Sequence, residues 1–181
     1  MSLRIAVIGL GAWGSTLAGL FEEQGHRVQG WSRRQGGDPI ALLADAELVV
    51  MATALQGVRE LAQQLAPHWP SGLPLLSCSK GIDLEQQCTP SQLWQQQLSA
   101  IPLVVLSGPN LATELAAGLP AASVLASHDQ ALATQLQQAL SSERLRLYTN
   151  SDPVGTEVAG ALKNVMAIAA GVCDGLNLGA N

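Results

Sequence analysis

The sequence predicts an α/β protein with a doubly wound, mostly parallel β-sheet, followed by the first long helix of a second, helical domain. Short apolar runs alternate with longer segments of helical spacing, as in repeated β-α-β units. Of the 181 residues, 48% are hydrophobic but only 3% are aromatic, so the core must be built from Leu, Val, Ile and Ala. That composition suits a parallel sheet covered by helices on both faces.

The expected elements follow from these runs. The strands are predicted at residues 4–8, 27–31, 48–52, 74–78, 103–107, 122–126 and 145–148. The helices between them are predicted at residues 13–24, 56–66, 90–98, 111–117 and 130–140. Between the second and third strands a Gly-Gly-Asp-Pro turn at residues 36–39 leaves only residues 40–43 for a helix, so we expect one or two turns there.

The chain changes character after Asn150. Ser151-Asp-Pro153 is a helix start, with a capping side chain followed by proline, and small and apolar residues continue for about five turns from Val154. We expect this helix to be packed on several sides at a domain junction. The predicted division is residues 1–150 and residues 151–181, and we expect the chain to be the N-terminal portion of a longer protein.

Composition excludes several function classes. The net charge of −5 argues against a nucleic-acid binder, which needs a basic patch. The three cysteines are widely spaced and form no CxxC motif. We therefore expect reduced thiols and neither a metal site nor a disulfide framework. No targeting segment is expected, and Lys163 and Asn164 interrupt the most apolar stretch, so we expect no membrane span and a cytoplasmic protein.

A glycine-rich turn follows the first strand. Gly9, Gly11 and Gly14 form a GxGxxG motif that leads directly into a predicted helix, which is the context that dinucleotide-binding turns require. The first glycine permits the tight turn, the second admits the pyrophosphate, and the third allows close packing of helix and strand. We therefore predict a Rossmann-type nucleotide site at Gly9, Gly11, Ala12, Trp13 and Gly14.

The end of the second strand indicates which nucleotide binds. NAD-selective sites usually carry Asp or Glu about 20 residues after the turn, but here the segment is Gly30-Trp-Ser-Arg-Arg34. Arg33 and Arg34 suit the 2′-phosphate of NADP, because guanidinium groups form paired, charged hydrogen bonds to phosphate. NADP(H) is the predicted cofactor, and NAD(H) is the alternative. A different interpretation of Arg33 and Arg34 is that they form a solvated strand end and bind no ligand.

The chain has two lysines, and both occur in distinctive settings. Lys80 follows the fourth predicted strand, at the sheet edge where ligands bind in open α/β folds. Lys163 lies within the long apolar helix, where burial would lower its pKa and suit it to proton transfer.

At this point the sequence resembles the N-terminal part of bacterial NAD(P)-dependent glycerol-3-phosphate dehydrogenases. The motifs that carry the resemblance occur in the family's order over essentially the whole chain. They are Gly9-Leu-Gly-Ala-Trp-Gly14, Trp31-Ser-Arg-Arg34, Ser79-Lys-Gly-Ile82, Ser107-Gly-Pro-Asn110, Gly155-Thr-Glu157, and Gly160-Ala-Leu-Lys-Asn164 through Gly171-Val-Cys-Asp-Gly175.

The resemblance implies reversible reduction of dihydroxyacetone phosphate to sn-glycerol 3-phosphate, which supplies glycerophospholipid synthesis. It implies that Lys163 exchanges the proton, that Lys80 contacts both cofactor and substrate, and that Gly108 lies at the substrate. The residues that it places at the cofactor are Trp13, Arg33, Arg34, Lys80, Asn110 and Ala112. It also implies a homodimer for the full-length protein.

The chain departs from the family at four places, one of which is the short segment between the second and third predicted strands. Asn110 stands where Ser or Thr is commoner, and Leu111 where an aromatic residue is usual. The Asp and the Ser-Arg-Asn cluster of the family's second domain, which hold glycerol phosphate, do not occur here, so we expect weak activity or none.

Two other functions stay open. One is a related 2-hydroxyacid or ketopantoate-type reductase, against which the pattern from Gly160 to Gly175 counts. The other is a non-catalytic NADP-binding domain, which would need no proton-transfer lysine.

Overall fold

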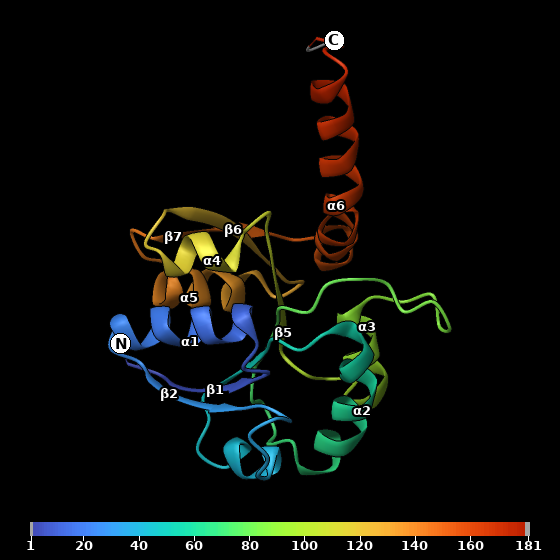
Figure 1. The fold of residues 1–181 in the computed structure, drawn as a ribbon. Coiled ribbons are helices and arrows are strands. Elements are labelled where there is room, and N and C mark those ends of the chain that lie inside the picture. Colours follow the sequence, from blue (N-terminus) through green and yellow to red (C-terminus); the bar gives the residue numbers. More distant parts are fainter. Residues whose placement is uncertain (1, 180–181) are drawn as a thin grey trace.

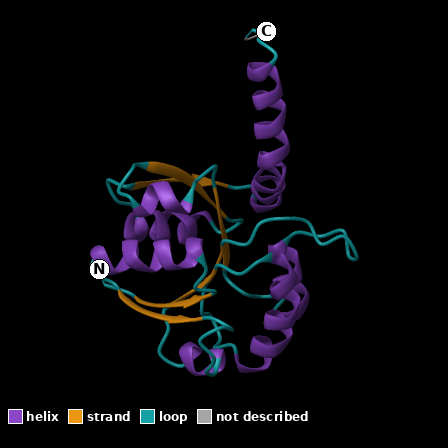
Figure 2. Cartoon of the chain, viewed as in Figure 1, coloured by secondary structure: helices purple, strands orange, loops and turns teal. Residues whose placement is uncertain are grey.

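The fold is taken from a computed structural model that describes residues 2–179. Seven strands form one sheet in the order β2-β1-β3-β4-β5-β6-β7, and all neighbouring pairs are parallel except β5 and β6. Their bounds are β1 (Arg4–Ile8), β2 (Arg27–Trp31), β3 (Leu48–Met51), β4 (Leu75–Ser77), β5 (Leu103–Ser107), β6 (Ala121–Ala126) and β7 (Leu145–Asn150). These are the predicted strands to within one or two residues, and Figure 2 shows them as a curved layer.

Helices cover both faces of the sheet. One group is α1 (Ala12–Glu23), α4 (Ala112–Ala116) and α5 (Gln130–Leu140); the other is η1 (Pro39–Leu43), α2 (Leu55–Leu65), η2 (Ala66–His68) and α3 (Pro90–Gln97). Side chains of β1 alternate between the two layers: Ile5 and Val7 pack in the cluster beneath α1, whereas Ala6 and Ile8 pack in the cluster beneath α2. Figure 1 shows these two groups of helices on opposite sides of the sheet. The doubly wound α/β prediction is therefore confirmed.

Strand β6 is the exception, because it runs antiparallel to β5. The chain between these two strands, residues 108–120, carries the five-residue helix α4. After α4 the chain re-enters the sheet from the edge at which β5 ends, so β6 runs in the opposite direction.

The last helix, α6 (Pro153–Gly175), stands out from the body of the molecule (Figure 1). Asp152 caps it by accepting a hydrogen bond from the Gly155 N–H, and its buried residues are Pro153, Glu157 and Gly160. The expectation of packing on several sides is therefore met only in the first two turns. The exposed large apolar residues on and just after α6 include Leu162, Val165, Met166, Ile168, Val172, Leu176 and Leu178.

The same helix bears on the membrane expectation. By length and composition alone, α6 is sufficient to cross a bilayer, although no part of its most apolar window is buried. One such helix is weak evidence, because helices of water-soluble proteins meet the same criterion.

Candidate active site

The glycine turn is shaped by close contacts between β1, β3 and α1. Gly9 has a φ of +108°, and a Cβ there would lie 2.7 Å from the carbonyl carbon of Ala52. A Cβ on Gly14 would overlap the carbonyl oxygen of Gly9. A Cβ on Gly11, by contrast, would meet no atom within 4 Å. Two of the three glycines are therefore required by the protein's own packing, and the third faces open space.

The start of α1 offers unused amide donors beside that space. Gly11 is the N-cap and provides no side-chain cap. The Ser15 N–H donates to the Gly11 carbonyl at 2.9 Å, so the amides of Ala12, Trp13 and Gly14 precede the first hydrogen bond of the helix. An uncapped helix start of this kind binds phosphate through its N–H groups and its positive dipole end.

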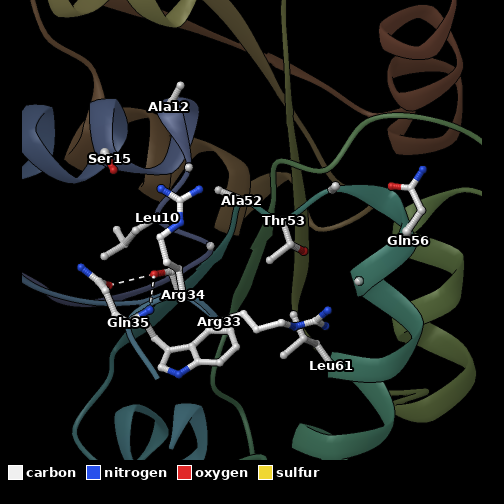
Figure 3. A pocket seen from close by; sticks show the side chains of 16 residues that line it. Leu10, Ala12, Ser15, Arg33, Arg34, Gln35, Ala52, Thr53, Gln56 and Leu61 are labelled. Carbon is white, nitrogen blue, oxygen red and sulfur yellow. Dashed lines mark hydrogen bonds between the residues drawn. The ribbon is translucent and has the colours of Figure 1, made fainter. Parts of the chain in front are cut away.

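A cleft of about 770 Å³ lies at this end of the sheet. It opens at the end of β1, which lies between β2 and β3 in the sheet. The order of strands reverses at this point, and ligands of doubly wound folds usually bind there. The residues that line it come from the glycine turn, the end of β2 and the segment after β3 (Figure 3). They are Gly9–Ala12, Ser15, Trp31–Gln35, Ala52–Ala54, Gln56, Gly57 and Leu61.

The two arginines of the cleft point in different directions. Figure 3 shows Arg34 rising toward the start of α1, close to Ala12, whereas Arg33 extends toward α2. Arg33 forms an ion pair with Glu60 of α2 at 2.6 Å, with both side chains largely exposed. Over residues 2–179, Arg34 has no acidic partner within ion-pair distance, so its guanidinium is the one available to an anion in the cleft.

Lys80 lies just beyond β4, on a segment that is fastened at two points. The Ser79 hydroxyl donates to the carbonyl oxygen of Thr53 at 2.7 Å. Further along, Arg59 of α2 holds both carboxylate oxygens of Asp83 at 2.9 Å. Between these points the Lys80 ammonium donates to the Gly108 carbonyl at 2.9 Å and lies 5.9 Å from the centroid of the Trp13 ring.

The two lysines differ in their surroundings. Burial lowers the pKa of Lys80, and the nearby charge of Lys163 lowers it further. Lys163 itself is only half-buried, so the expected burial is met in part. Lys163 lines a second cavity of about 370 Å³, together with Ser107, Gly108 and Gly160. Lys80 and Lys163 therefore place two cations around the end of β5.

The segment after β5 carries the remaining predicted residues. A Cβ on Gly108 would lie 2.8 Å from the Ala122 carbonyl oxygen, so only glycine fits beside β6. The amide of Asn110 donates to the Ser123 hydroxyl at 2.5 Å, and the Ala112 carbonyl accepts a weak 3.4 Å hydrogen bond from Thr16. Neither Asn110 nor Ala112 lines the large cleft, and their roles at the cofactor stay predictions.

The structure also brings in residues that the sequence analysis did not single out. Thr53 and Gln56 line the cleft opposite Arg34 (Figure 3). The position of Thr53, directly after β3, could have indicated it, because β3 lies beside β1 and ligands bind outside the carboxyl ends of such strands. Glu157 belongs to one of the motifs that carry the resemblance, but the burial of its carboxylate was not predicted; in the sequence it is one acid within an apolar helix.

The residues present fit a dinucleotide. The open space at Gly11 would admit a pyrophosphate against the first amides of α1, and Arg34 with Ser32 would face the ribose that lies at the end of β2. The described residues contain no cluster of three or more His, Cys, Asp or Glu side chains suited to a metal ion.

Comparison with known proteins agrees with this geometry. Residues 4–41 and 37–133 match the description "NAD-dependent glycerol-3-phosphate dehydrogenase N-terminus", and residues 152–181 match the C-terminus of the same family. A glycerol-3-phosphate dehydrogenase (NAD(P)+) of Synechococcus sp. strain RCC307 is 60% identical over 181 residues, covering 100% of this chain and 60% of that protein. Its counterpart from strain JA-2-3B'a(2-13) is 52% identical and covers 98% of this chain and 56% of that protein.

Solved structures give the same picture. The glycerol-3-phosphate dehydrogenase of Coxiella burnetii superposes with a TM-score of 0.86 at 28% identity, covering 99% of this chain and 63% of that one. A 3-hydroxyisobutyrate dehydrogenase of Mycobacterium tuberculosis has a TM-score of 0.73 at 16% identity, covering 99% and 68%, and this likeness shows the fold alone. The chain spans about 60% of the length of the curated relatives that it matches. By the matches over most of its length, the chain belongs to the NAD-dependent glycerol-3-phosphate dehydrogenase family.

Proposed function

We propose that this chain provides the nucleotide site and the two lysines of an enzyme that reversibly reduces dihydroxyacetone phosphate to sn-glycerol 3-phosphate with NAD(P)H. The observation that carries the proposal is the Lys80 ammonium bonded to the Gly108 carbonyl, with the charge of Lys163 nearby. Two cations beside a dinucleotide turn suit a small substrate that carries both a phosphate and a carbonyl. The names of the relatives support the same reaction.

The two lysines divide the chemistry. A bound nicotinamide cofactor would supply a hydride to the C2 carbonyl of the substrate. As negative charge develops on the carbonyl oxygen, the Lys163 ammonium stabilises it and donates the proton. In the oxidation direction Lys163 accepts that proton. Lys80 anchors the substrate by its charge, and its contact with the Gly108 carbonyl fixes the direction of the ammonium group.

The proposed cofactor is NADP(H), with NAD(H) as the second choice. Arg34 is free to bind a 2′-phosphate, and the end of β2 carries no acid that would repel it. Arg33 contributes less, because Glu60 already holds its guanidinium.

The wider setting follows from the family. We propose a cytoplasmic enzyme that binds no nucleic acid, has no membrane span, forms a homodimer at full length, and feeds glycerophospholipid synthesis. Residues 1–150 form the nucleotide domain, and residues 151–181 begin the substrate domain. Because the chain spans about 60% of the length of its relatives, it binds nucleotide but turns over substrate weakly or not at all.

The test titrates the chain separately with NADPH and NADH by quenching of tryptophan fluorescence, with Trp31 in the cleft as a reporter. We expect saturable binding with a preference for NADPH, and absence of binding would overturn the proposal. Residual NADPH oxidation by dihydroxyacetone phosphate is then followed at high protein concentration in the wild type and in Lys163→Met. Activity in the wild type that Lys163→Met retains in full would exclude Lys163 as the proton donor, as a different active site requires.

A further inference from the structure

A carboxylate is buried where α6 meets the nucleotide domain. The Glu157 side chain belongs to a residue that is 2% exposed. Its Oε1 accepts the backbone N–H of Ser91 at 2.9 Å, and its Oε2 accepts the Ser91 hydroxyl at 2.5 Å. Over residues 2–179 this is the only side chain of α6 that hydrogen-bonds to another element. The polar connection between α6 and the rest of the described chain therefore rests on one carboxylate.

The partner of Glu157 is the start of a helix. Thr89 caps α3 in a reciprocal capping box with Gln92, and Ser91 is the second residue of the helix. A carboxylate at this place satisfies an amide that has no partner inside the helix and lies at the positive end of the helix dipole. Burial raises the pKa of Glu157, whereas the hydrogen bonds from Ser91 and Thr89 lower it. Polar groups of α3, and no cation, therefore hold this carboxylate.

The two elements that meet at Glu157 each lead to one lysine. α6 carries Lys163, six residues beyond Glu157, or about 9 Å along the helix axis. α3 directly follows the loop of residues 78–89 that carries Lys80. A second contact lies one turn before Lys163: a Cβ on Gly160 would overlap the Ser107 hydroxyl at the end of β5. The Gly160 contact sets how closely α6 approaches β5, whereas the hydrogen bonds of Glu157 tie α6 to the start of α3.

We propose that Glu157 is a positioning residue, which fixes the separation and orientation of Lys163 and Lys80 by tying α6 to the start of α3. The contact between Glu157 and Ser91 does not depend on any ligand, whereas its consequence for turnover rests on the proposed function. Loss of the carboxylate leaves the Ser91 amide unpaired in a buried place, and α6 then relieves that cost by shifting its first turns. Such a shift moves Lys163 relative to Lys80, whereas the cleft at the glycine turn is unchanged.

The chain has only two lysines, which makes their coupling measurable. Selective ¹³C labelling of lysine side chains gives two signals, and Lys163→Met assigns them. In the wild type the charge of Lys163 helps to lower the pKa of Lys80, so Lys163→Met should raise it. Glu157→Ala should raise the Lys80 pKa in the same direction. Glu157→Gln, which can still accept the Ser91 N–H and donate to its hydroxyl, should leave it at the wild-type value.

Two further variants separate positioning from general stability. Leu65→Ala removes a fully buried side chain of α2, far along the chain from Glu157, and should lower the melting temperature without changing the Lys80 pKa. Ser91→Ala removes one of the two hydrogen bonds and no charge, and should give part of the Glu157→Ala shift. If Glu157→Ala does not fold, the Lys80 pKa of Ser91→Ala tests the positioning role in its place. A folded Glu157→Ala or Ser91→Ala with the wild-type Lys80 pKa overturns the proposal.

This result does not depend on substrate. The lysine titration uses the chain alone, so a failure to bind NADPH or to reduce dihydroxyacetone phosphate would overturn the proposed function and leave the coupling result standing. Conversely, normal nucleotide binding together with an unchanged Lys80 pKa in Glu157→Ala would overturn the positioning role and leave the proposed function standing.

Discussion

Alanine substitutions at three glycines of one turn and helix should have three different outcomes. Gly14 and Gly19 both lie inside α1, where alanine is favoured over glycine by about 1 kcal/mol. At Gly19 a Cβ would meet no atom within 4 Å, so Gly19→Ala should gain roughly that amount. At Gly14 a Cβ would overlap the Gly9 carbonyl oxygen and lie 3.0 Å from its carbonyl carbon. Both are backbone atoms, so the helix must move away from β1, at a net cost of about 3 kcal/mol.

Gly11 separates ligand binding from stability. It is the N-cap, with φ −81°, so alanine is conformationally allowed and a Cβ there would meet no protein atom within 4 Å. Gly11→Ala should cost about 1 kcal/mol or less as a cap change, yet it places a methyl group where we expect the pyrophosphate.

Thermal unfolding with and without NADPH measures all three substitutions. At about 2–4 °C per kcal/mol for a chain of this length, we expect Gly19→Ala to melt a few degrees higher and Gly14→Ala roughly 6–12 °C lower. Gly11→Ala should melt near the wild type but lose the stabilisation that NADPH gives the wild type. A Gly14→Ala as stable as Gly19→Ala would refute the packing argument, and a Gly11→Ala that NADPH still stabilises fully would refute the position of the phosphates.

Three further predictions concern the arginines, the buried carboxylate and the thiols. Arg34→Ala should weaken NADPH binding about 10- to 100-fold, the value of one charged hydrogen bond, and Arg33→Ala should weaken it far less; titrations that give equal losses would contradict the assignment of Arg34. Burial raises the pKa of Glu157 above its ordinary value of 4.5, so its contribution to stability should fall as pH rises from about 4.5 through the folded pKa. Urea unfolding of the wild type and of Glu157→Gln over this pH range measures the effect. The free energy of unfolding of the wild type should fall relative to that of Glu157→Gln as pH rises, and a relative increase would contradict the prediction. Burial raises the pKa of Cys78 to about 12, and Cys173 is exposed. A thiol reagent at pH 8 should therefore label Cys173 rapidly and Cys78 only on unfolding. The rapid phase of labelling should be absent in Cys173→Ser.

Most of the fold could be predicted from the sequence because its pattern is set by local chemistry. The apolar runs at β1 and β5 have the predicted bounds, since both faces of these strands meet helices and nearly every position favours apolar residues. The edge strand β2 also has the predicted bounds, although its residues are exposed or half-buried. The direction of β6 is not visible in such a run, because it depends on the path of the connection through α4 and not on the residues of the strand.

The site was predictable where a residue acts through the backbone and less so where it acts through a partner. Gly9, Gly11 and Gly14 follow from the geometry of one turn. The difference between Arg33 and Arg34 depends on Glu60, which is 27 residues away in the sequence. Burial of Lys163 was overestimated, because an apolar helix in the sequence does not reveal how much of its surface other elements cover.

The proposed roles separate nucleotide binding from proton transfer. The cleft is built from the turn after β1 and the ends of β2 and β3, so we expect Gly11 and Arg34 to act on the nucleotide without contact with α6. The proposed proton donor, Lys163, is carried by α6, which contacts the sheet through Gly160 and is tied to α3 by Glu157. Substitutions at Gly11 and Arg34 should therefore weaken NADPH binding while the coupling between the lysines survives. Substitution of Glu157 by Ala should change the coupling while NADPH binding survives. If one substitution removed both properties at a temperature where the chain is folded, α6 and the glycine turn would have to form a single cooperative unit, which their separate contacts do not provide.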